Sequence, residues 1–232
     1  MINELVYPNS PKLVSAEGNT AVFEIVPLYP GYGTTIGNLL RRVLLSSIPG
    51  WGITKVKIEN VLHEFANLPG VLEDILDLTL NLKQLRVGYT GSAEVELTLE
   101  AKGKKEVRAG EIKGPNNMVI ANPDLVIATL TTDKAELKMR LTAEPGLGYS
   151  RAEDREEREV EPGLIVLDAI FSPIRNVSFE LDEIKVGKRT DFNLLRLAIE
   201  SDGTITPTAA MVQAIEIISK HLNIINEASA SD

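Results

Sequence analysis

The segment Gly31–Gly50 constrains the fold more than any other part of the chain. It joins a glycine-rich turn to a helical pattern, and the Pro49-Gly50 pair ends the helix. Thr34 or Thr35 is the expected N-cap, because a hydroxyl there accepts a bond from a free backbone N–H. Apolar residues spaced three and four apart form one stripe on this helix: Ile36, Leu39, Leu40, Val43 and Leu44. A short helix with such a stripe is typical of a protein–protein contact.

The composition indicates a globular protein with an aliphatic core. Of its 232 residues 44% are hydrophobic and only 5% aromatic, so aliphatic side chains must fill the interior. The chain has no cysteine, which excludes disulfides and thiolate chemistry and fits a cytoplasmic protein. Met1–Leu5 lacks the basic and apolar regions of a signal peptide, and runs such as 164–170 are too short to span a membrane. We therefore expect a cytoplasmic location and no membrane partner.

The net charge of −9 bears on the choice of partners. Proteins that bind free DNA usually neutralise its phosphates with clustered Lys and Arg. Only short basic tracts occur in this chain, so direct and strong nucleic-acid binding is disfavoured.

Strand and helix patterns alternate along the chain. Strands are predicted at residues 20–27, 53–61, 94–100, 136–141, 176–186 and 192–200. A helix is predicted over 71–82. Glu73 and Asp74 would lie in its first turn, where the helix dipole favours negative charge. The stretch 144–161 combines Gly and Pro with dense charges and is expected to be a mobile loop.

The last helical pattern has two apolar sides. Thr206 is the expected cap, and Pro207 is expected at the first helical position. Spacings of four, three, four and three residues give a short heptad seam made of Met211, Ile215, Ile218, Leu222 and Ile225. Ala214, Ile217 and Ile224 widen this face, so the helix should pack both on its own sheet and on a second surface.

These elements predict an α+β fold with two domains. The two ends of the chain need each other, because neither contains enough strands for a full sheet. Residues 1–52 and 166–232 are therefore expected to form one discontinuous domain, an antiparallel sheet with two helices. Residues 53–165 are expected to be an inserted β-rich domain.

The segment Gly31–Gly50 also resembles a block near the start of the bacterial RNA polymerase alpha subunit: Gly-(aromatic)-Gly-x-Thr-(aliphatic)-Gly-Asn-x-Leu-Arg-Arg-x-Leu-Leu-Ser-Ser-x-Pro-Gly. The resemblance continues, in the family's order, at residues 61–65, 70–76, 80–83, 168–174, 189–191 and 203–205. It implies a homodimer that scaffolds the beta and beta-prime subunits of a DNA-directed RNA polymerase, a nucleotidyltransferase. The ends of the chain would form the dimerisation domain, and the subunit itself would carry no catalytic residue.

The resemblance also implies contact residues. Arg42 and Leu45 match positions that contact the beta subunit, and a guanidinium fork suits a carboxylate there. Lys83 and Leu167 match positions that contact the beta-prime subunit, and Arg189 matches a position that affects assembly. The dimer interface would use the first and last helices through Ile36, Leu39, Leu40, Val43, Met211, Ile215, Ile218, Leu222 and Ile225. A solvated arginine pair or an ion pair within the domain is the plainer interpretation of Arg41 and Arg42.

Two departures limit what is carried over from the family. Most bacterial alpha subunits continue into a small C-terminal domain that binds promoter DNA, and no such domain is matched here. DNA contact is therefore expected only through the complex. The family tends to have more arginine before the tyrosine at position 149, whereas Leu147 stands here, so contacts of that loop are not carried over.

Two alternatives remain open at this point. The first is an unrelated enzyme with a ligand site at the turn of Gly31 and Gly33, although the third glycine, Gly37, misses the dinucleotide fingerprint and no phosphate loop is present. His63 and His221 lack the partners of a metal site, so no metal, cofactor or catalytic group is expected. The second is one half of an alpha-like heterodimer of the archaeal or eukaryotic type.

Overall fold

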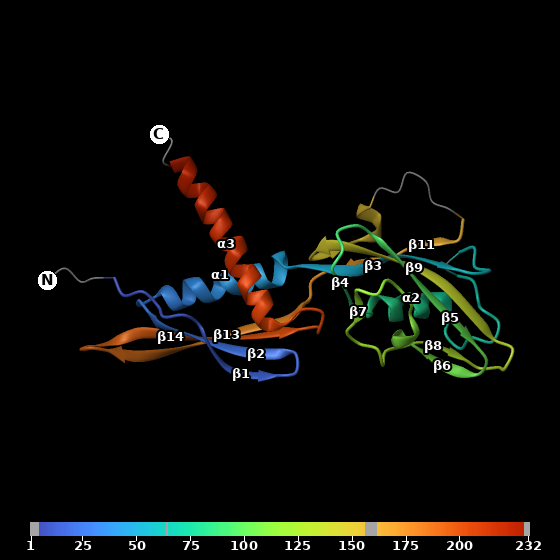
Figure 1. The fold of residues 1–232 in the computed structure, drawn as a ribbon, viewed down its shortest axis with the longest axis horizontal. Helices are drawn as coiled ribbons and strands as arrows, with labels where there is room; N and C mark the ends of the chain where they lie inside the picture. The colour runs from blue at the N-terminus through green and yellow to red at the C-terminus, as the bar shows by residue number, and fades with distance from the viewer. Residues whose placement is uncertain (1–4, 64, 156–161, 230–232) are drawn as a thin grey trace. The chain divides into compact units, whose positions relative to one another are not determined.

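The structure is a computed structural model that describes residues 5–63, 65–155 and 162–229 (Figure 1). Helices and antiparallel strands make up the fold, which confirms the α+β class. The chain divides into two compact units, residues 1–48 with 173–232, and residues 49–172. None of the described helices is long and apolar enough to cross a membrane.

The first unit contains a sheet made from both ends of the chain. Strands β1 (Lys12–Glu17), β2 (Thr20–Leu28), β14 (Arg189–Ser201) and β13 (Ile174–Val186) follow one another in that order, all antiparallel. β2 and β14 lie side by side at its centre (Figure 1). Neither hairpin alone would provide a sheet of this width, so the two ends of the sequence depend on each other for their core.

Helix α1 (Tyr32–Ser47) lies on this sheet and begins earlier than predicted. Its N-cap is Gly31, at a φ of 86°, and no side chain caps the helix. The prediction of a threonine cap is therefore wrong, because the left-handed glycine turn starts the helix before Thr34 is reached. Gly37 faces the sheet, where an added Cβ would lie 2.8 Å from the Phe179 ring. The glycine thus lets the helix approach β13 closely.

Helix α3 (Pro207–Ser229) begins as predicted. The Thr206 hydroxyl accepts a bond from the Ala209 amide at 3.2 Å, which confirms the cap. The first turns are buried against α1 and the sheet through Ala210 and Ala214. The rest of the helix, drawn in red, extends beyond the sheet (Figure 1).

The second unit is built on a six-stranded sheet in the order β5-β9-β3-β4-β7, with β11 also paired to β3. Its strands are β3 (Pro49–Ile58), β4 (Val87–Tyr89), β5 (Val95–Lys102), β7 (Met118–Ile120), β9 (Glu136–Leu147) and β11 (Leu164–Val166). Two further pairs are β6 (Lys105–Arg108) with β8 (Val126–Leu130), and β10 (Tyr149–Ser150) with β12 (Ala169–Ile170). Short 3₁₀ turns follow at Ala109–Glu111 and Ala152–Asp154.

Helix α2 (Ile75–Lys83) is shorter at its start than the predicted 71–82. Val71 forms a β-bridge with Leu130, so the chain is extended there. The Glu73 carboxylate accepts bonds from the amide and hydroxyl of Thr129, at 2.7 and 2.9 Å, instead of lying in the first helical turn. These bonds to the neighbouring strand outweigh the local helical pattern. Asp74 then caps the helix.

The boundaries of the two units also differ from those predicted from the sequence. β3 starts at Pro49, opposite Leu147 of β9, so the second unit begins there and not at residue 53. The unit ends at Ser172, because β12 pairs with β10. Part of the predicted loop 144–161 is strand, since β9 continues to Leu147, whereas residues 156–161 lie outside the described part of the chain.

Candidate functional site

The first unit exposes a set of large apolar side chains on α3 and α1, two helices that contact each other. We call it the apolar stripe, and it consists of Leu39, Ile215, Leu222 and Ile225. Half-buried Ile36, Val43 and Ile218 pack against the core of the same unit. Leu222 is 58% exposed although it is a large hydrophobic residue. Exposed apolar side chains that share one helix, as Ile215, Leu222 and Ile225 do, are typical of an interface.

Two residues predicted for the dimer interface lie inside the subunit. Leu40 and Met211 are only 4% and 3% exposed and belong to the core of the first unit. Their side chains therefore offer no surface to a partner, which corrects the prediction. The apolar periodicity of a helix shows which residues avoid water but not whether the chain or a partner covers them. Val212 and Ile224 are exposed, and the predicted interface residues did not include them.

The two arginines of α1 have different surroundings. Arg41 Nε donates a hydrogen bond to the Val177 carbonyl at 3.1 Å and thereby links the helix to β13. Arg42 is exposed, and its carbonyl accepts a bond from the Ser46 hydroxyl at 2.8 Å. Leu45 is half-buried against the core. Both arginines are exposed, and Arg41 is the one whose guanidinium is also bound to the sheet.

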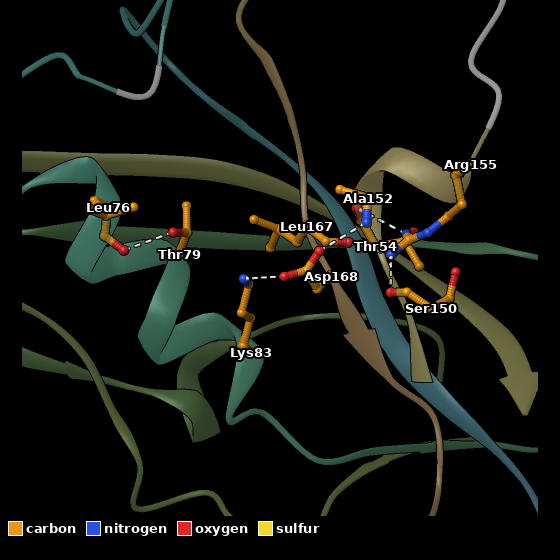
Figure 2. Close-up of polar contacts among 9 residues, drawn as sticks. All are labelled: Thr54, Leu76, Thr79, Lys83, Ser150, Ala152, Arg155, Leu167 and Asp168. Carbon is orange, nitrogen blue, oxygen red and sulfur yellow. Dashed lines mark hydrogen bonds and ion pairs between the residues drawn. The ribbon is translucent and has the colours of Figure 1, made fainter. Parts of the chain in front are cut away.

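A polar cluster in the second unit surrounds Asp168 (Figure 2). Lys83, the last residue of α2, forms an ion pair with Asp168 at 2.9 Å between Nζ and Oδ2. The other carboxylate oxygen accepts a bond from the Ala152 amide at 2.9 Å. These bonds, first the amide and then the Lys83 ammonium, hold the pKa of Asp168 below its ordinary value.

Arg155 forms further hydrogen bonds in the same region. Its guanidinium donates to the carbonyls of Thr54 at 3.4 Å and Ser150 at 3.2 Å, and also to the carbonyl of Leu167 (Figure 2). One side chain thus joins β3, β10 and the residue that follows β11. The planar fork of arginine makes such a multiple contact possible, which a single ammonium group cannot reproduce. Arg155 Nε is buried and has no hydrogen-bond partner among the residues that the structure describes.

Leu167 lies in this cluster through its backbone only. Its side chain is 3% exposed and belongs to the core of the second unit, so the predicted side-chain contact with a partner is corrected. Sequence reasoning also gave no role to Asp168 or Arg155. Asp168 stood within a family motif, but its partners come from distant parts of the chain and leave no local signal. Nearby, the buried Thr79 hydroxyl donates to the Leu76 carbonyl at 2.7 Å within α2 (Figure 2).

Arg189 is bound within the first unit. Its guanidinium donates to both carboxylate oxygens of Asp191 at 3.0 and 2.7 Å, and to the Tyr29 hydroxyl at 3.3 Å. It also lies over the rings of Tyr29 and Phe192, 5.2 and 5.3 Å from their centroids. The Asp191 carboxylate, followed by the Tyr29 hydroxyl, raises the pKa of Arg189. This geometry gives Arg189 a structural role at the start of β14.

Side chains of the first unit occupy the space beside the glycine turn that precedes α1. The Gly31 amide donates to the Asn193 side chain at 3.1 Å. A Cβ at Gly33 would lie 2.6 Å from Leu181 and 3.0 Å from Asn193. The turn therefore serves helix packing, and its geometry does not favour a nucleotide site.

Comparison with known proteins gives consistent matches. The family described as RNA polymerase Rpb3/RpoA insert domain matches residues 56–172. Proteins named DNA-directed RNA polymerase subunit alpha are similar over most of the chain. The one from Desulfitobacterium hafniense is 46% identical over 209 residues, 90% of this chain and 66% of that protein. The one from Aquifex aeolicus is 43% identical over 228 residues, 97% and 71% of the two chains. The one from Thermus aquaticus is 46% identical over 211 residues, 90% and 67% of the two chains. The matched part of this chain thus spans about two thirds of the length of these relatives.

Proposed function

The chain belongs to the family of DNA-directed RNA polymerase alpha subunits, and we propose on that basis that it is an assembly scaffold of the polymerase. In this proposal two copies form a homodimer and bring the beta and beta-prime subunits together. The subunit contributes architecture to DNA-templated RNA synthesis and no group that reacts with nucleotides. DNA is then contacted only through the complex. The names of the relatives support this function over an unrelated enzyme at the glycine turn.

The apolar stripe is the observation that carries the homodimer. Leu222 and Ile225 are 58% and 61% exposed on a helix that extends beyond its own sheet. Burial of such side chains is worth about 1.5–3 kcal/mol each when it is complete. A two-fold axis would place the same stripe of a second copy against it, so that each residue of the stripe is buried in both copies. The heptad spacing on α3 suits such helix packing.

Separate surfaces are proposed for the two large subunits. Arg42 presents an exposed guanidinium on α1, beside Leu45, and would bind a carboxylate of the beta subunit. The region of Lys83 in the second unit would bind the beta-prime subunit. Arg189 would affect assembly indirectly, by holding the start of β14 against Tyr29.

Light scattering during size-exclusion chromatography, followed by co-expression with the organism's own beta and beta-prime subunits, tests the proposal. We expect the mass of a dimer at micromolar concentration, and a complex in which both large subunits copurify with the tagged chain. A monomeric chain would contradict the homodimer. A dimer that recruits neither large subunit would contradict the scaffold.

A further inference from the structure

Lys83 does not offer a free ammonium group to a partner. Its Nζ lies 2.9 Å from Asp168 Oδ2, and the two side chains are 30% and 33% exposed. Charge-assisted bonds of this length are among the stronger ones in proteins. The ammonium has two further N–H groups, but a partner that drew it away from Asp168 would break this bond and leave the carboxylate without its charge partner.

Asp168 connects Lys83 to another part of the chain. Its second oxygen accepts the Ala152 amide at 2.9 Å, at the start of the 3₁₀ turn Ala152–Asp154. Three residues later, Arg155 binds the carbonyls of Thr54, Ser150 and Leu167. Residues 149–155 are therefore held at the start by pairing with β12, at Ala152 by Asp168 and at the end by Arg155. We call Lys83, Asp168 and Arg155 the clamp, and residues 149–155 the clamped segment.

The clamped segment carries exposed apolar surface. Tyr149 is 59% exposed on β10, and Ile170, its partner on β12, is 43% exposed. Tyr149 and Ser150 pair with Ile170 and Ala169, the two residues that follow Asp168, so the exposed ring lies on the strand pair next to the clamp. Aromatic side chains of this kind are frequent anchors of protein interfaces.

From this geometry we infer that Lys83 is a positioning residue: it acts through Asp168 to hold the clamped segment in place, and the beta-prime subunit binds the surface of that segment. The inference rests on the proposed function and refines it. Removing any member of the clamp should then weaken beta-prime recruitment in the same way, even where the Lys83 ammonium is untouched.

Three variants of the full chain, tested with the organism's own beta and beta-prime subunits, separate positioning from direct contact. Lys83→Met removes the ammonium, Asp168→Asn removes the charge that binds it, and Arg155→Lys loosens the far end of the segment without touching Lys83. We expect all three to lower beta-prime copurification, and Lys83→Arg to restore it. Hydrogen exchange at the Ala152 amide should be about tenfold faster in Lys83→Met and Asp168→Asn, since a bond to a charged group is weakened.

Direct contact predicts a different pattern. Asp168→Asn would release the ammonium and leave beta-prime recruitment intact, Arg155→Lys would have no effect, and Lys83→Met alone would abolish it. That pattern, or unchanged exchange at Ala152, would overturn the inference. Dimer mass, beta-subunit copurification and the unfolding midpoint serve as controls, because the clamp lies in the second unit. If the wild type recruits neither large subunit, the proposed function itself fails, and the exchange rates still report whether the clamp holds the segment.

Discussion

Leu222→Glu should convert the proposed dimer into a folded monomer. Leu222 lies in the second half of α3 and is 58% exposed in the isolated chain. Complete burial of a leucine is worth about 1.5–3 kcal/mol. Since more than half of that surface is still available, its burial in a two-fold interface contributes about 2–4 kcal/mol over both copies.

The glutamate loses this contribution and adds a penalty. A carboxylate without a partner in an apolar seam costs several kcal/mol, and the symmetry of the dimer brings two of them together. Even about 4 kcal/mol in total raises the dimer Kd about a thousandfold. Substitution at an exposed position away from the core should change the stability of the monomer by only about 0.5 kcal/mol.

Sedimentation equilibrium over a range of concentrations would measure the Kd, and circular dichroism would check the fold. Asn223→Glu is the matched control, because it adds the same charge one residue further along, about 100° around the helix. We expect a dimer for Asn223→Glu and a monomer for Leu222→Glu. A dimer of unchanged Kd in Leu222→Glu would refute the placement of the seam on this face of α3.

Three further predictions concern α1 and the clamp. Arg42→Ala should keep the dimer and lose beta-subunit copurification. Arg41→Ala removes a bond to the sheet and should lower the free energy of unfolding by about 1 kcal/mol. Equal effects of the two substitutions on the free energy of unfolding would count against this distinction. Gly37→Ala should destabilise the chain in a urea titration. Overpacking against the Phe179 ring costs about 1–3 kcal/mol, which outweighs a gain in helix propensity of about 1 kcal/mol. A more stable variant would show that the ring moves aside freely. The pKa of Asp168 should lie below its ordinary 3.8. Its contribution to stability is therefore complete only well above that ordinary value, and it is lost as the pH falls through the lowered pKa. An NMR titration of the carboxyl carbon with a midpoint at or above 3.8 would contradict the bonds seen in the clamp.

Regular patterns along the chain predicted most of the secondary structure. The alternating strands at 94–100 and 136–141 correspond to β5 and β9, and the Thr206-Pro207 start of α3 was predicted to the residue. These predictions succeed because alternation, capping and proline act within a few residues of each other. The start of α2 was predicted wrongly for the opposite reason, since residues 71–73 bind a strand that follows much later in the chain.

The sequence by itself determined the fold class, the family and the identity of the helices that carry apolar faces. Only the tertiary structure decided which of those faces is covered by the chain. Leu40 and Leu39 are neighbours on α1, yet the first lies in the core and the second is exposed. It likewise decided that Arg41 binds β13, and that Lys83 is bound to Asp168. Periodicity records how strongly a side chain avoids water, whereas burial and pairing depend on residues that are distant in sequence and meet only in the folded chain.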